Sequence, residues 1–255
     1  MLNLLCSLNW CVIYEFAILY VGTAQQLSKV SMDHLNIGTA QVKPSSCVRN
    51  LGSWFDTQLN MKQHVSKFCG AAFYHLHNLR RIRKYLSIST TVQLVHALIS
   101  CRLDYCNSLL YGLPSFTTNK LQRVQNAAAR LVSESPRFSH ITPILFDLHW
   151  LPILYRIIFK ILLITYKAVH GQCPKYIQDL IIRKEKGRYL LRSDDEYILE
   201  RPNFRSLATL GDRSFYVAAP TLWNKLPYTI RSSPHIDYFK QQLKTHLFTL
   251  AFDTS

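Results

Sequence analysis

The sequence predicts a mainly α-helical protein with a small β region near its N-terminal end, an α+β fold class. Over residues 61–83 apolar side chains recur at helical spacing, and residues 152–170 are apolar on most helical faces. Residues 30–56 instead alternate short apolar runs with Gly, Pro, Ser and Asn, which is typical of short strands. A hydrophobic content of 48% with 18% charged residues argues against disorder. A chain of 255 residues is long enough for a substantial core.

Three segments follow along the chain. Residues 1–56 are expected to hold the strands after a divergent apolar start, and residues 57–136 to form a helical domain. Residues 137–255 are expected to be a mostly helical segment with an exposed basic loop at 183–205.

The apolar run at residues 1–22 has two interpretations. Its length is close to that of a membrane span. However, Glu15 interrupts it, and no Lys or Arg precedes Lys29 to make the basic start of a signal peptide. The aromatic and β-branched residues from Tyr14 to Val21 favour a buried strand, and a membrane segment is the alternative.

Helices are expected over 61–83, 91–111, 115–132 and 152–170, with a last amphipathic helix from Ile236. Ser87 to Thr90 supply capping side chains for the second helix. A Gly-Leu-Pro break at 112–114 separates it from the third, so residues 96–132 make a helical hairpin. Gly171 suits the position just after the fourth helix.

Basic residues cluster in the helical part of the chain. Residues 1–60 are neutral, residues 61–140 hold 11 basic against 2 acidic residues, and residues 141–255 hold 16 against 10. Such a surplus favours a polyanionic partner, most often RNA or DNA, although many basic proteins bind nothing specific. The candidate phosphate contacts end the first helix or flank the apolar stripe of the third: Arg80, Arg81, Arg83, Lys84, Lys120, Arg123 and Arg130. The alternative is a set of solvated cations, since cations near a helix C-terminus also complement the macrodipole.

No metal, cofactor or catalytic arrangement is indicated. The seven cysteines are odd in number and lack a CxxC pair, which favours free thiols in an intracellular compartment, nuclear or cytoplasmic. Cys101 and Cys106 near His96 fit no structural zinc spacing and are expected on a buried helix face. Asp194 and Asp195 stand among arginines and are expected in a solvated turn.

Several short sequence motifs resemble those of one protein family. These are CRLDYCN at 101–107, YGLP at 111–114, LQRVQNAAAR at 121–130, HITP at 140–143 and LHWLP at 148–152. Together with residues 215–227 they closely resemble the region C-terminal to the catalytic palm in non-LTR retrotransposon (LINE-type, Jockey/CR1-like) reverse transcriptases. The resemblance covers roughly residues 15–250.

The resemblance implies that residues 1–56 are a palm remnant and residues 57–136 a thumb. Asn50-Leu51-Gly52 then resembles the hairpin that grips the primer, although a glycine in a bulged hairpin explains it equally well. Family members hold the paired catalytic aspartates upstream of the strand that ends near Gly22, so we expect no enzymatic activity.

We therefore expect a truncated, non-catalytic remnant that at most binds RNA, DNA or an RNA–DNA hybrid without sequence preference, with no small-molecule substrate. The alternatives are a structural or interaction fragment, part of an active RNA-directed DNA polymerase, and a protein anchored to a membrane by residues 1–22.

Overall fold

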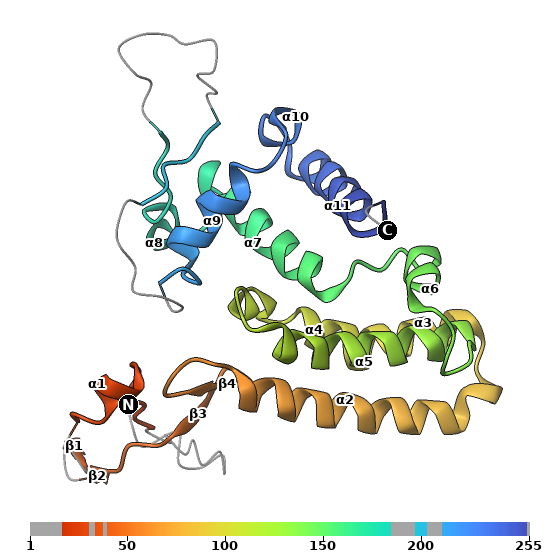
Figure 1. Cartoon of the computed structure of the whole chain (residues 1–255), viewed down its shortest axis with the longest axis horizontal. Coiled ribbons are helices and arrows are strands. Elements are labelled where there is room, and N and C mark those ends of the chain that lie inside the picture. Colours follow the sequence, from red (N-terminus) through yellow and green to blue (C-terminus); the bar gives the residue numbers. More distant parts are fainter. Residues whose placement is uncertain (1–16, 31–33, 38–39, 185–196, 203–210, 254–255) are drawn as a thin grey trace, which may run out of the picture. The chain divides into compact units, whose positions relative to one another are not determined.

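A computed structural model describes residues 17–30, 34–37, 40–184, 197–202 and 211–253 (Figure 1). The chain divides into two compact units, Met1–His64 and Val65–Ser255. The described residues are mostly helical, with two small hairpins near the N-terminal end, which confirms the mainly α fold class. The boundary expected at residue 136 falls inside the second unit, whereas the one expected at residue 56 lies close to the observed division.

The first unit contains a short helix and two antiparallel hairpins. Helix α1 (Ala24–Leu27) begins with a capping box, in which Thr23 and Gln26 bond each other's backbone N–H. Strand β1 (Leu35–Ile37) pairs with β2 (Ala40–Val42), and β3 (Cys47–Asn50) pairs with β4 (Ser53–Asp56). Two residues connect β3 to β4, Leu51 with φ 45° and Gly52 with φ 86°. Positive φ at both positions is the geometry of a two-residue hairpin turn, which favours glycine at the second.

The expected buried strand from Tyr14 to Val21 is wrong for its described part, and residues 14–16 lie outside the described residues. Ile18 forms only an isolated bridge with Pro44, and Val21 is 51% exposed. Single backbone hydrogen bonds hold this extended segment, from Ser45 N–H to the Ile18 carbonyl oxygen and from Gly22 N–H to the Thr57 carbonyl oxygen. Without a continuous ladder the segment is not a strand.

The described part of the second unit consists mainly of helices. Its longer helices are α2 (Lys62–Ile82, within this unit from Val65), α5 (Ser115–Ser133), α7 (Ile153–Val169) and α11 (Ile236–Phe252). The shorter ones are α3 (Ile88–Val95), α4 (Cys101–Asp104), α6 (Ile141–Asp147), α8 (Lys175–Gln178), α9 (Phe215–Trp223) and α10 (Tyr228–Arg231). The helices expected over 61–83 and 152–170 are thus confirmed to within about one residue at each end.

One core cluster joins α2, α3 and α5. It contains Ala72, Leu76 and Leu79 of α2, Val95 and Ile99 around the end of α3, Val124, Ala128, Ala129, Leu131 and Val132 of α5, and then Leu145 and Trp150. Ala128 and Ala129 of α5 are almost fully buried, which allows the neighbouring helices a close approach. The apolar stripe predicted for α5 therefore faces this core.

A second group of buried rings lies around α7, which packs against α9 and α11. The Tyr166 ring stacks on Phe239 with centroids 4.3 Å apart, and the Trp223 ring lies 5.8 Å from Phe239. The Tyr166 hydroxyl donates a hydrogen bond to the Ser233 carbonyl oxygen at 3.0 Å. This packing confirms α7 as a central helix of the C-terminal half, and Gly171 follows it with φ 68°.

The helix expected over 91–111 is wrong in its second half. Helix α3 begins after Ser87, whose Oγ accepts from Thr90 N–H at 3.1 Å as predicted. A π-helical turn (His96–Ser100) follows, and α4 ends at Asp104. Cys106 then adopts a left-handed conformation with φ 54°, and a 3₁₀ turn (Asn107–Leu110) completes the segment. Cys101 is exposed, so the expectation of two buried cysteines on one helix face is also wrong.

Some expectations fall on residues outside the described part of the chain. Asp194, Asp195 and most of the basic loop at 183–205 belong to this group, as do residues 1–16 of the apolar run. Within the described residues, no helix has the length and apolar character needed to cross a membrane.

Candidate nucleic-acid interface

A groove of about 980 Å³ runs between α2 and α5 in the second unit. One wall is the C-terminal half of α2 with the 3₁₀ turn Arg83–Tyr85, and the other is α5 with residues 134–137. Its lining comprises Phe73, Leu76, His77, Arg80, Arg83, Lys84, Arg123, Asn126, Ala127, Arg130, Leu131, Glu134, Ser135 and Arg137. We call this feature the α2–α5 groove.

Helical spacing explains why cations meet in the α2–α5 groove. Residues three or four apart share a helix face, which places Arg80 and Lys84 together at the end of α2. Arg123 and Arg130 are two turns apart on α5 and also share a face. The apolar stripes of both helices pack into the core between them, so the cations border the groove.

The groove is strongly basic. Six of its lining residues are Lys or Arg and one is acidic. Five of the seven predicted phosphate contacts are among them: Arg80, Arg83, Lys84, Arg123 and Arg130.

The other two predicted residues lie elsewhere. Arg81 is exposed but does not line the groove. Lys120 lies near Cys69: burial raises the pKa of the Cys69 thiol, and the positive charge of Lys120 opposes that rise. Lys120 is therefore associated with the earlier part of α2 rather than with its cationic end.

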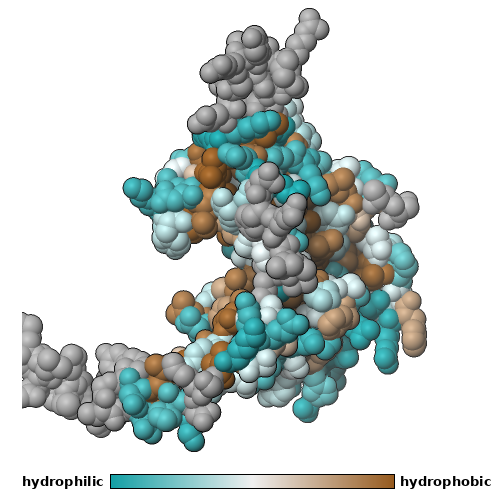
Figure 2. All heavy atoms as spheres, turned by 60° about the vertical axis from the view of Figure 1, so that its left-hand side comes forward, coloured by the Kyte–Doolittle hydropathy of each residue, from teal (hydrophilic) through white to brown (hydrophobic). Residues whose placement is uncertain are grey.

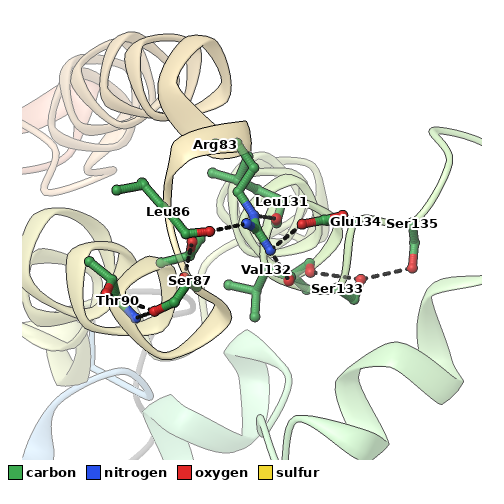
Figure 3. Close-up of polar contacts among 11 residues, drawn as sticks. Arg83, Leu86, Ser87, Thr90, Leu131, Val132, Ser133, Glu134 and Ser135 are labelled. Carbon is green, nitrogen blue, oxygen red and sulfur yellow. Dashed lines mark hydrogen bonds and ion pairs between the residues drawn. The ribbon is translucent and has the colours of Figure 1, made fainter.

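Arg83 is buried, with 8% of its surface exposed, whereas the neighbouring Arg80 and Lys84 are exposed. Its Nε donates to the Leu131 carbonyl oxygen at 3.1 Å, and its two terminal nitrogens donate to the carbonyl oxygens of Leu86 at 2.8 Å and Val132 at 3.4 Å. It also pairs with Glu134 (Figure 3). Arg83 thus caps the C-terminal carbonyls of α5. Its ion pair with Glu134 neutralises the one acidic residue of the groove lining.

Arg130 is half-buried at the floor of the groove. One terminal nitrogen donates to the Ser139 carbonyl oxygen at 3.0 Å. Its Nε is buried and has no hydrogen-bond partner among the described residues. A buried N–H without a partner costs free energy, which an anionic acceptor in the groove would recover.

The remaining cations keep their charge available. Arg80, Lys84, Arg123 and Arg137 are exposed, and none forms an ion pair with a carboxylate of the described residues. Lys84 Nζ lies 4.8 Å from the centroid of the Tyr85 ring. These four side chains give the α2–α5 groove a positive electrostatic potential.

Exposed aromatic rings accompany these cations. Phe73 lines the groove and is 45% exposed, while Tyr85 is 76% and Phe138 93% exposed. The Arg137 guanidinium carbon lies 5.9 Å from the centroid of the Phe138 ring. Rings exposed beside cations can stack on nucleic-acid bases.

The sequence reasoning missed Arg137 and these rings. Arg137 follows Pro136, beyond the end of α5, so helical periodicity gave no signal for it.

The hairpin resembling a primer grip lies in the first unit. Leu51 stands at the tip of the β3–β4 turn and is 83% exposed, and Asn50 pairs with Ser53. The observed two-residue turn accounts for Gly52 without a nucleic-acid contact.

The described residues contain no group of three or more His, Cys, Asp or Glu side chains placed to hold a metal ion. On the face drawn in Figure 2, hydrophobic residues occur in separate groups among hydrophilic ones. Comparisons of the chain with protein-family models, curated proteins and solved structures found no match.

Proposed function

We propose that this chain binds RNA, DNA or an RNA–DNA hybrid through the α2–α5 groove, without reading base sequence. The observation that carries this proposal is the convergence of unpaired cations from two helices and a turn on one groove, whose single carboxylate is already paired with Arg83.

The physical basis is phosphate neutralisation. Lys and Arg side chains bound to phosphates release condensed counterions, so affinity falls steeply as salt rises. Arg80, Lys84, Arg123 and Arg137 have long side chains and no opposing carboxylate among the described residues. Contacts of this kind position a nucleic acid but carry no base information.

The sequence resemblance supports the same assignment. In non-LTR retrotransposon reverse transcriptases the corresponding segment is the thumb, which lies along the template–primer duplex. The proposal is therefore a thumb-like binding role for residues 57–136. The proposal is limited to binding and includes no catalytic step.

Fluorescence anisotropy with labelled probes tests the proposal. The full chain should bind two unrelated RNA–DNA hybrids with equal affinity, and the double variant Arg80→Glu/Arg123→Glu should lose at least about tenfold in affinity. Arg102→Glu/Lys175→Glu removes two exposed cations that lie outside the groove and is the matched control. Undetectable binding by the wild-type chain at low salt, or equal losses in both variants, would contradict the proposal.

A role as an interaction fragment is the second candidate. Several large apolar side chains are exposed, namely Tyr74 in the middle of α2 and Ile82, Tyr85 and Ile88 around the α2–α3 connection. Exposed apolar groups of this kind can mark a protein contact. Concentration-dependent oligomers in light scattering, abolished by Tyr74→Ser/Ile88→Ser, together with no nucleic-acid binding, would favour this candidate.

A further inference from the structure

A second cavity, of about 460 Å³, lies within the second unit. Its walls come from the turn after α4, the loop between α6 and α7, α7 itself and α11. The cavity shares no lining residue with the α2–α5 groove. Its size falls within the range of small-molecule sites, roughly 300–1,000 Å³.

A buried acceptor without a partner lines this cavity. Asn107 is 4% exposed, and its Nδ2 lies 3.5 Å from Asp104 Oδ1. Asn107 Oδ1 is buried and has no hydrogen-bond partner among the described residues. An unsatisfied buried acceptor costs free energy, which a ligand N–H donor in the cavity would recover.

The groups around Asn107 are held firmly. Arg156 donates from one terminal nitrogen to both carboxylate oxygens of Asp104, at 3.0 and 2.8 Å. Its Nε donates to the Leu151 carbonyl oxygen at 3.0 Å. Asp104 is therefore held by Arg156 and lies beside the Asn107 amide nitrogen, while the Asn107 amide oxygen has no partner among the described residues.

The rest of the lining combines apolar walls with two cations. Phe159 is half-buried and lines the cavity together with Trp150, which is 6% exposed, and Leu148 and Leu163 are apolar neighbours. Lys160 of α7 and Lys244 of α11 also line the cavity, and neither pairs with a carboxylate of the described residues. The site thus presents a flat apolar region, one acceptor and two unpaired positive charges.

Backbone strain occurs beside the cavity. Cys106, directly before Asn107, has φ 54°, and His149 in the α6–α7 loop has φ 55°. Non-glycine residues with positive φ cost free energy and persist where the surroundings require them. Asn107 and Trp150, which directly follow these two residues, both line the cavity.

We propose that this cavity binds a nucleoside 5′-monophosphate. The base lies against Trp150 and Phe159 and donates an N–H to Asn107 Oδ1, while Lys160 and Lys244 bind the phosphate. This ligand goes beyond the proposed function, and it adds a small molecule to a chain for which no small-molecule substrate was expected. The ligand is either a free nucleotide or the 5′-terminal nucleotide of a strand, because both present a base and a 5′-phosphate.

Isothermal titration calorimetry with the full chain tests this site. The probes are AMP, GMP, CMP and UMP, each compared with its nucleoside and with inorganic phosphate. We expect at least one nucleotide to bind about tenfold more tightly than its nucleoside and than phosphate. No binding by any nucleotide, or phosphate binding as tightly as the best nucleotide, would overturn the proposal. A 5′-phosphorylated dinucleotide that binds more tightly than the mononucleotide identifies a strand end, and weaker binding identifies a free nucleotide.

Variants locate the site. Lys160→Gln/Lys244→Gln should weaken nucleotide binding about tenfold without changing nucleoside binding, and Asn107→Leu should weaken both. The control Lys175→Gln/Lys225→Gln changes two exposed lysines outside the cavity. If Asn107→Leu fails to fold, the double lysine variant still decides: unchanged nucleotide affinity overturns the site. Arg80→Glu/Arg123→Glu should leave nucleotide binding intact, which separates this proposal from the groove.

Discussion

Arg83 Nε donates a hydrogen bond to the backbone carbonyl oxygen of Leu131 at 3.1 Å, across a sequence separation of 48 residues. This contact joins the 3₁₀ turn after α2 to the end of α5 (Figure 3), and Arg83 and Leu131 both line the α2–α5 groove. The buried Arg83 therefore connects the two segments that carry the exposed cations of the groove.

Arg83→Met should destabilise the protein by about 2–4 kcal/mol, because it removes charged donors from three backbone carbonyls. The exposed ion pair to Glu134 adds little to this figure, since Glu134 is 64% exposed. Urea denaturation of the full chain measures the change, with the exposed Arg81→Met as control. Equal stability of the two variants would show that Arg83 has no capping role.

Gln125→Leu should cost about 0.5–1.5 kcal/mol, because the Leu151 carbonyl keeps the hydrogen bond from Arg156 Nε but loses the one from Gln125. Gln125 is 2% exposed, and its Nε2 donates to the Leu151 carbonyl oxygen at 2.8 Å. Gln122 bonds both Gln125 and the Ile153 N–H, so the pair connects α5 to the start of α7. Thermal denaturation checks the effect against Gln93→Leu, an exposed glutamine of α3. A smaller loss of stability for Gln125→Leu than for Gln93→Leu would show that the Gln125 hydrogen bonds do not stabilise the fold.

Lys120→Gln should slow alkylation of Cys69 at pH 8. Burial raises the pKa of the Cys69 thiol, and the nearby Lys120 charge opposes that rise. Removing the charge therefore raises the pKa further and lowers the thiolate fraction. Peptide mass spectrometry after maleimide labelling gives the rate. Exposed Cys101 in the same molecule is an internal control, and a parallel slowing at Cys101 would count against a local effect.

The first unit should lose stability as pH falls below about 6.5. Burial lowers the pKa of His64 from its ordinary value of 6.5, and its Nδ1 accepts a hydrogen bond from Trp54 N–H at 3.4 Å. Above pH 6.5 both folded and unfolded states hold a neutral imidazole. Below it the unfolded state binds the proton more readily, so stability falls until the folded-state pKa is passed and then stays constant.

Hydrogen exchange at the Trp54 amide measures this loss. Exchange protection should decrease between pH 7.5 and 5.5 by more in the wild-type chain than in His64→Gln, once the intrinsic pH dependence of exchange is removed. Identical changes in both proteins would exclude His64 as the cause.

The sequence predicted the regular helices well, because their signals are local. The bounds of α2 and α7 follow from apolar periodicity, and the start of α3 follows from the Ser87 cap. The break after Asp104 was not predictable, because Cys106 adopts a left-handed conformation although cysteine is not a residue type that favours it.

The candidate site was predictable in part. Helical spacing brought Arg80, Lys84, Arg123 and Arg130 to one groove. It did not distinguish Arg83, because an arginine at a helix end has the same pattern whether it faces solvent or caps a neighbouring helix. That distinction depends on α5, which lies far away in the sequence.

The salt dependence of hybrid binding tests the groove most directly. A plot of log affinity against log salt concentration should become shallower by about 1.5–2 in Arg80→Gln/Arg123→Gln, because each lost phosphate contact removes about 0.9 from the slope. The same plot should keep the wild-type slope in Arg102→Gln/Lys175→Gln. A wild-type slope in the groove variant would show that the α2–α5 groove does not bind the nucleic acid.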